Sequence, residues 1–154
     1  MNFSRRKGAW NALEYKQNAK KCVILLHEIY GINQHITGYA KLFFQEGFDV
    51  YVPDLSGRSE PFSYEEEELA YENFMSNVGF SKAAKQVEQL IQEISPQYEE
   101  VRIVGFSVGA TIAWLCSANP SVQKVIGFYG SRIRQYVDIV PTGDVFLIYS
   151  EHEK

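Results

Sequence analysis

The residues best suited to chemistry in this chain are the five that spell Gly-Phe-Ser-Val-Gly at positions 105–109. This G-x-S-x-G pattern follows an apolar run at 101–104 and precedes a helix-like stretch at 108–117. A serine on a tight strand-to-helix turn has its hydroxyl pushed out above the end of the sheet, and the turn leaves room only for small flanking residues. The sequence therefore predicts that Ser107 is a nucleophile.

The elements that must position this serine follow from hydrophobic patterning. Short apolar runs without polar alternation indicate strands that are buried on both faces, and apolar residues spaced by three and four indicate helices. We expect strands at 22–26, 48–52, 101–104, 122–129 and 144–149, and helices at 33–47, 83–95 and 108–117. Alternation of this kind is typical of an α/β protein with a mostly parallel sheet.

In such sheets the ligand crevice lies beyond the carboxyl ends of the strands. Three sequence features fall there: His-Glu-Ile-Tyr-Gly at 27–31, Asp-Leu-Ser-Gly-Arg at 54–58, and the turn at 105–109. In this order and at these spacings they resemble the dienelactone hydrolase family of α/β hydrolases. The resemblance runs from about residue 21 to the last residue. It implies a three-layer α/β-hydrolase fold with helices on both faces of the sheet, in one domain over 1–154 that lacks the final helix and strand.

The resemblance also implies roles for individual residues. Ser107 takes the nucleophile position, where members best known for dienelactone cleavage have cysteine, so this chain looks more like the general esterase variants. Glu28 matches the glutamate that lies beside the nucleophile and helps control its proton. The amides of Val108 and Ile29 match the two oxyanion-hole donors, and Arg58 matches an arginine that contacts a substrate carboxylate.

Each of these side chains also has a purely structural interpretation. Ser107 could be a small residue that a tight turn tolerates. Glu28 ends an apolar strand, where an unpaired carboxylate is costly to bury, so either a function or a structural ion pair must explain it. Arg58 could pair with Asp54 or Glu60 at the rim, because exposed arginines pair readily.

A serine nucleophile needs a base and an orienting acid, which this fold supplies in the chain order serine, acid, histidine. Glu153 best matches the family acid, with Glu151 as a weaker candidate. The family histidine lies well downstream of that acid, and nothing in the chain corresponds to it. His27, His35 and His152 remain as substitutes. Only His152 merits consideration, although adjacent side chains on an extended segment point apart. We expect the base to be missing.

The segment 59–79 is the least regular part of the sequence, with four consecutive glutamates at 65–68. It is either a short solvated helix or a flap over the crevice. The strand expected at 145–149 would be an exposed edge with an uncovered apolar face, which predicts self-association or poor solubility.

Composition excludes several other classes. The chain has 154 residues, 45% of them hydrophobic, which suffices for one core but not for two ordinary domains. A net charge of -4 without a long basic stripe argues against nucleic acid as a partner. No apolar run approaches the roughly 20 residues that span a bilayer, so we expect a cytoplasmic protein without a membrane partner. Cys22 and Cys116 lack metal-ligand spacing, and no metal or organic cofactor is implied.

The serine motif and the resemblance to the dienelactone hydrolase family imply hydrolysis of a small carboxylic ester or lactone through an acyl-enzyme on Ser107. The competing hypothesis is a hydrolase-fold remnant, impaired in catalysis, that binds a small acid or a protein partner through the same crevice. A nucleotide-binding βαβ protein is disfavoured, because Gly105 and Gly109 lack the G-x-G-x-x-G arrangement that cradles a pyrophosphate.

Overall fold

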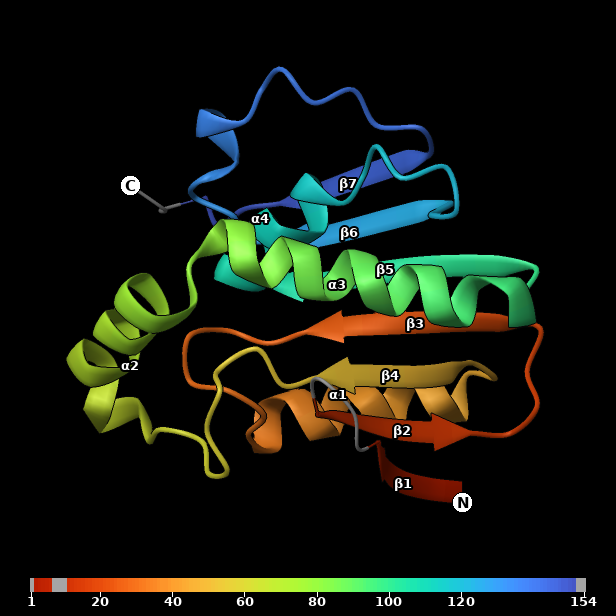
Figure 1. Cartoon of the computed structure of the whole chain (residues 1–154), viewed down its shortest axis with the longest axis horizontal. Helices are drawn as coiled ribbons and strands as arrows, with labels where there is room; N and C mark the ends of the chain where they lie inside the picture. Colours follow the sequence, from red (N-terminus) through yellow and green to blue (C-terminus); the bar gives the residue numbers. More distant parts are fainter. Residues whose placement is uncertain (1, 7–10, 152–154) are drawn as a thin grey trace.

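The computed structural model describes residues 2–6 and 11–151, with side chains from residue 11 onward. Its centre is a seven-stranded sheet in the order β1-β2-β4-β3-β5-β6-β7 (Figure 1). The strands are β1 (Asn2–Arg6), β2 (Ala12–Lys16), β3 (Lys21–Leu26), β4 (Asp49–Pro53), β5 (Glu100–Phe106), β6 (Lys124–Phe128) and β7 (Asp144–Ile148). All pairs from β4 to β7 are parallel, whereas β1 and β2 run antiparallel to their neighbours. This confirms the predicted α/β class and mostly parallel sheet.

Helices cover both faces of the sheet, as expected: α1 lies on one face, and α3 and α4 lie on the other (Figure 1). Their bounds are α1 (Gln34–Gln45), α2 (Glu67–Asn73), α3 (Phe80–Ile94) and α4 (Val108–Leu115). The Asn33 side chain caps α1 by accepting the Ile36 amide at 3.2 Å. After the helix, Gly47 has a φ of 100°, which glycine adopts without steric cost.

Each face of the sheet carries its own hydrophobic core. In β3, Cys22, Ile24 and Leu26 pack toward α3 and α4, whereas Val23 and Leu25 pack toward α1. All five side chains are fully buried. Burial on both faces explains the uninterrupted apolar run in the sequence.

β7 forms one edge of the sheet (Figure 1). Phe146, Leu147 and Ile148 are 54%, 37% and 43% exposed. Phe146 and Ile148 pair in register with Ile126 and Phe128 of β6. An apolar edge of this kind favours pairing with another chain, and self-association through it stays a prediction.

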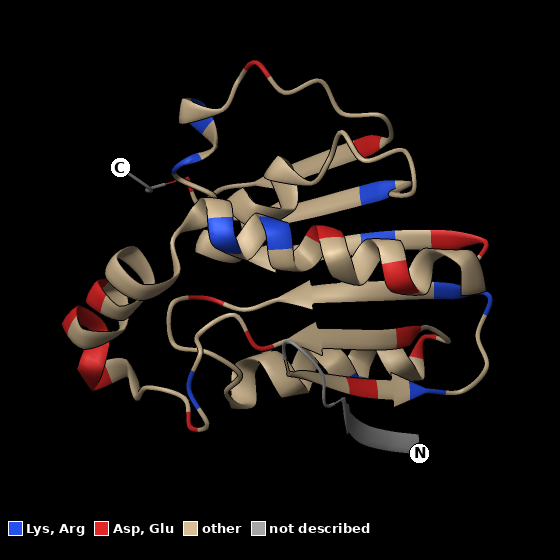
Figure 2. Cartoon of the chain, in the orientation of Figure 1, with Lys and Arg blue, Asp and Glu red and all other residues tan. Residues whose placement is uncertain are grey.

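The segment 59–79 folds into three consecutive short helical pieces. They are the 3-10 turn η1 (Tyr64–Glu66), α2 and the π-helical turn η2 (Phe74–Val78). The acidic side chains gather on the first two of these pieces (Figure 2). Within the described residues, no helix is both long and apolar enough to cross a bilayer.

Candidate active site

Ser107 occupies a strained turn between β5 and α4. Its φ of 58° and ψ of -119° lie far from the regions that residues other than glycine normally adopt. Strain of this kind costs about 1–3 kcal/mol and persists only where the surroundings enforce it. Here the Ser107 amide donates to the Phe128 carbonyl at 2.7 Å, which ties the turn to the end of β6.

Two glycines make this turn possible. A Cβ atom on Gly105 would overlap the carbonyl oxygen of Gly109. A Cβ atom on Gly109 would lie 2.5 Å from the carbonyl oxygen of Leu26 and 2.7 Å from that of His27. The first turn of α4 therefore packs directly on the backbone that leads from β3 to Glu28. This contact brings two of the three features predicted from the sequence together.

The two amides implied as oxyanion-hole donors remain available. Val108 is the first residue of α4, where backbone amides have no partner within the helix. Ile29 lies in the loop after β3, beside the contact made by Gly109. Within the described residues, neither amide donates to an acceptor. Backbone amides without an acceptor can stabilise an oxyanion.

Glu28 is partly buried and has a partner that the sequence did not reveal. Its Oε1 lies 3.5 Å from Nδ1 of His35, and the two side chains are 27% and 33% exposed. Burial raises the pKa of Glu28, and His35 partly opposes this by lowering it. His35 is therefore the partner in the ion pair that the sequence left open as an explanation of Glu28. Such a pair is compatible with a function for the carboxylate.

His27 is fully occupied by backbone contacts. Its Nε2 accepts the Leu55 amide at 2.8 Å, so the ring proton must sit on Nδ1, which donates to the Glu28 carbonyl at 2.5 Å. The Asp54 carboxylate lies 3.9 Å from Nε2, but the Leu55 donor requires a neutral ring. His27 therefore links the loop after β3 to the loop after β4 and has no free nitrogen for catalysis.

This neutral histidine predicts a pH dependence of stability. Burial lowers the pKa of His27 below its ordinary value of 6.5. Just below this pH, the unfolded chain therefore binds a proton at His27 and the folded chain does not. The contribution is complete above about pH 6.5. This contribution to the free energy of unfolding decreases as the pH falls below about 6.5, by up to about 1.4 kcal/mol per pH unit.

The test of this prediction is urea unfolding of the wild type and of His27→Gln between about pH 7 and about pH 5. The free energy of unfolding should fall less steeply with decreasing pH in the variant. The raised pKa of Glu28 acts in the opposite direction, lowering stability as the pH rises above about 4.5, and is common to both chains. Equal slopes would contradict the assignment of a neutral His27.

Arg58 lies on the exposed segment after β4. Its guanidinium carbon lies 3.8 Å from the centre of the Phe62 ring, and its Nε donates to the backbone carbonyl of Glu60 at 3.3 Å. The Asp54 carboxylate instead accepts the Ser56 amide and hydroxyl at 3.0 and 2.7 Å. Within the described residues, Arg58 makes no ion pair with Asp54 or Glu60.

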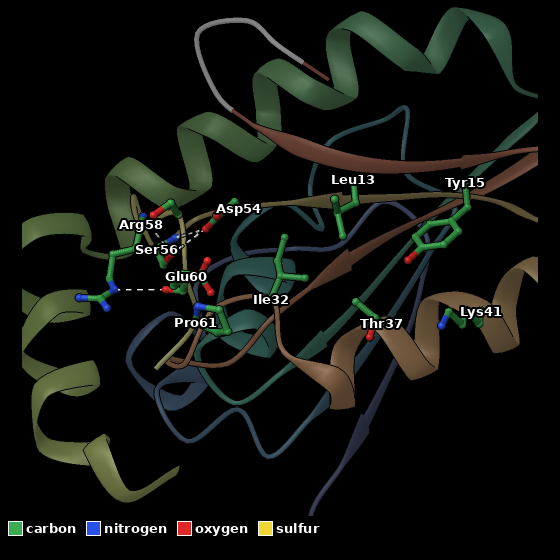
Figure 3. A pocket seen from close by; sticks show the side chains of 11 residues that line it. Leu13, Tyr15, Ile32, Thr37, Lys41, Asp54, Ser56, Arg58, Glu60 and Pro61 are labelled. Atoms are coloured by element: carbon green, nitrogen blue, oxygen red, sulfur yellow. Dashed lines mark hydrogen bonds between the residues drawn. The ribbon is translucent and has the colours of Figure 1, made fainter. Parts of the chain in front are cut away.

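A cavity of about 550 Å³ lies between α1 and the segment that carries Arg58 (Figure 3). Tyr15, Thr37 and Lys41 line one end, and Arg58 and Glu60 line the other. Neither Ser107 nor Glu28 is among the described residues that line it.

The segment 59–79 touches both sides of the crevice. Tyr64 packs edge-on against Tyr30 of the loop after β3, with ring centres 4.8 Å apart. At the other end, Arg132 of the β6–β7 connection donates to the Tyr71 hydroxyl at 3.0 Å. The segment is thus a helical bridge, and its opening as a flap stays a prediction.

Comparison with known proteins assigns the chain to a family. The sequence model of the Dienelactone hydrolase family matches residues 10–150, nearly the whole chain. The chain belongs to the dienelactone hydrolase family. The resemblance drawn from the three sequence features is confirmed.

Relatives in this family are longer than the chain. A Bacillus subtilis protein named "Uncharacterized protein YczH" is 37% identical over 134 residues, which are 87% of this chain and 65% of that protein. A Synechocystis protein named "Putative carboxymethylenebutenolidase" is 26% identical over 125 residues, which are 72% of this chain and 48% of that protein. The aligned part of the chain thus spans 65% and 48% of the length of these two relatives.

A solved structure shows the same fold. The crystal structure titled "Putative Dienelactone Hydrolase" from Klebsiella pneumoniae has a TM-score of 0.70 and 18% sequence identity. The match covers 92% of this chain and 80% of that chain. This similarity confirms the predicted α/β-hydrolase fold.

Part of the family's predicted catalytic set lies outside the described residues. Glu153, expected as the acid, and His152, considered as a substitute base, are both in this group. His35 was not expected to act as the base, yet the structure pairs it with Glu28. His35 lies only seven residues after Glu28, but no local pattern in the sequence indicates that the first turn of α1 faces back toward that carboxylate.

The described residues contain no group of three or more His, Cys, Asp or Glu side chains arranged to hold a metal ion. Cys22 and Cys116 are buried and unpaired. Burial raises the pKa of Cys22 to about 12 and also raises the pKa of Cys116. Both thiols therefore stay protonated and act as small packing residues.

Proposed function

We propose that this chain cleaves a carboxylic ester or lactone through an acyl-enzyme formed on Ser107. The observation that carries the proposal is the strained backbone of Ser107, enforced by Gly105 and Gly109 against the loop of Glu28. Backbone strain at a serine on a strand-to-helix turn is expected where the hydroxyl must be presented to a substrate. Membership of the dienelactone hydrolase family supports the same reaction class.

In the first step, Ser107 Oγ forms a bond to the carbonyl carbon of the substrate and loses its proton. The carbonyl oxygen becomes an oxyanion, which the amides of Val108 and Ile29 are placed to stabilise. Each such donor is worth about a hundredfold or more in rate. The carbon–oxygen bond to the leaving group then breaks, and the leaving alkoxide takes up the proton that Ser107 passed to Glu28. Water cleaves the resulting acyl-enzyme to release the acid and restore the serine.

The other residues have supporting roles in this proposal. Glu28 accepts or steers the proton of Ser107, and its partly buried position favours proton uptake. Glu153 takes the acid role, and Arg58 recognises a carboxylate on the substrate. The name of the Synechocystis relative, a carboxymethylenebutenolidase, makes a lactone with a carboxylate a reasonable substrate class to test. The reaction as written needs no metal or organic cofactor.

A fluorophosphonate probe tests the nucleophile directly. We expect stoichiometric labelling of the wild-type chain, mapped by peptide mass spectrometry to Ser107, and none of Ser107→Ala. The phosphorus centre is attacked by an activated serine hydroxyl, whereas ordinary surface serines react negligibly. Labelling at another serine, or none within the time that a known serine esterase needs, would contradict the proposal.

A second candidate function has one observation in its favour. Of the two histidines that the structure describes, His27 is occupied by backbone groups and His35 faces Glu28. Neither makes a hydrogen bond to Ser107 within the described residues. A chain whose serine lacks a histidine base would bind a small acid or a protein partner without turnover. Absence of probe labelling would favour this alternative.

A further inference from the structure

We propose that His35 is a positioning residue that holds the Glu28 carboxylate, in its charged form, beside the turn of Ser107. This inference rests on the proposed function, because it concerns the group that receives the serine proton. It assigns a role to a side chain that none of the sequence features singled out as functional.

The geometry of the pair is the first support. Nδ1 of His35 lies 3.5 Å from Oε1 of Glu28. That nitrogen is shielded from solvent and has no hydrogen-bond partner in the described part of the chain. A buried polar atom without a partner is costly, and the carboxylate is the acceptor that it faces. A small adjustment would convert the contact into a charge-assisted hydrogen bond.

The His35 ring is held in place by aromatic neighbours. It packs edge-on against Phe106 and Tyr39, with ring centres 4.8 and 5.2 Å apart. Phe106 in turn stacks on Phe128 at 4.8 Å. Rings packed in this way restrict the imidazole to few orientations, so Nδ1 stays directed at the carboxylate.

The same neighbours connect the pair to the serine. Phe106 precedes Ser107 in the chain, and the Phe128 carbonyl accepts the Ser107 amide. The loop that carries Glu28 is fixed from the other side, where Gly109 packs on the carbonyls of Leu26 and His27. Both members of the pair are therefore fixed against the elements that build the turn.

The charges around the pair leave His35 as the group that acts on the carboxylate. Tyr30 lies on the same loop as Glu28, and Glu67 of α2 approaches that tyrosine. Tyr39 faces His35 from α1. None of these can carry a positive charge. Among the described residues, His35 is the charged partner that lowers the pKa of Glu28 against the opposing effect of burial.

This arrangement has a chemical consequence. A carboxylate can take up the Ser107 proton only while it is ionised, and burial alone favours its neutral form. His35 opposes this effect of burial by lowering the pKa of Glu28, which favours the ionised carboxylate. The serine proton then passes to a Glu28 oxygen, while His35 only orients the carboxylate.

The test is a ¹³C NMR titration of the Glu28 carboxyl carbon in the intact chain, with the resonance assigned by its loss in Glu28→Gln. His35→Phe keeps a ring between Phe106 and Tyr39 but removes the charge. We expect this variant to raise the Glu28 midpoint by roughly half a pH unit to one pH unit, after allowance for partial exposure. His35→Gln should shift it in the same direction. Tyr39→Phe, which keeps the ring packing, should leave it unchanged.

An unchanged Glu28 midpoint in both folded His35 variants would overturn the inference. This titration requires no turnover, so its outcome is independent of whether the chain hydrolyses an ester. Where hydrolysis is observed, the acid limb of kcat/KM should move to higher pH by the same amount in His35→Phe. A uniform loss of rate without that displacement would indicate a merely structural role and would also overturn the inference.

Discussion

Replacing Ser107 with alanine is expected to reduce the rate of hydrolysis of p-nitrophenyl acetate by about a hundredfold or more. The physical reason is that the substitution removes the Oγ atom that forms the acyl bond and leaves the backbone amides in place. In the variant, only substrate binding and stabilisation of the oxyanion can accelerate the direct attack of water on the ester. The measurement is the initial rate of p-nitrophenolate release at matched concentrations of folded protein.

The matched control for this prediction is Ser81→Ala. Ser81 is exposed near the start of α3, so its loss should leave the rate unchanged. If the wild type and Ser107→Ala both gave only the rate in buffer, the chain would have the hydrolase fold without hydrolase function. If the wild type and Ser107→Ala gave the same rate above that in buffer, another group would perform the cleavage.

Replacing Gly109 with alanine is expected to destabilise the fold by about 3 kcal/mol or more. The added Cβ would lie 2.5 Å from the Leu26 carbonyl oxygen and 2.8 Å from its carbon, and both atoms belong to the backbone of a central strand. The contact cannot be relieved by rotating a side chain, so α4 must move away from β3. Urea unfolding followed by circular dichroism measures the loss.

Gly38→Ala gives the matched control for this glycine. Gly38 lies inside α1, and a Cβ atom there would meet no other atom within 4 Å. Alanine at such a helical position should stabilise the chain by about 0.5–1 kcal/mol. If both variants unfolded at the wild-type urea concentration, the close packing of α4 on β3 would be wrong.

Much of the fold could be predicted because its signals are local. The run at 22–26 is apolar throughout since both faces of β3 are buried. Asn33 and Gly47 flank α1 at positions where capping chemistry selects those residue types. Pairing of β1 and β2 was not predicted, because Ala12–Lys16 is short, mixes polar and apolar residues and gains its place by pairing with strands distant or weakly marked in the sequence.

The candidate site also has one part that could be predicted from the sequence and one part that could not. The Ser107 turn could be predicted because glycine, serine and glycine must stand together in sequence to make it. The pair of Glu28 and His35 could not, because it depends on the angle at which α1 leaves the loop. The cavity beside Arg58 likewise depends on how β2 and α1 are spaced, which no local pattern of residues encodes.

The central claim is that Ser107 forms an acyl-enzyme, and trapping that species tests it most directly. The wild-type chain is mixed with p-nitrophenyl acetate, quenched in acid after a short interval and digested for peptide mass spectrometry. We predict one added acetyl group on the peptide that contains Ser107, at the serine itself, and none in Ser107→Ala. Release of p-nitrophenolate above the buffer rate with no acetyl group on Ser107 would contradict the account.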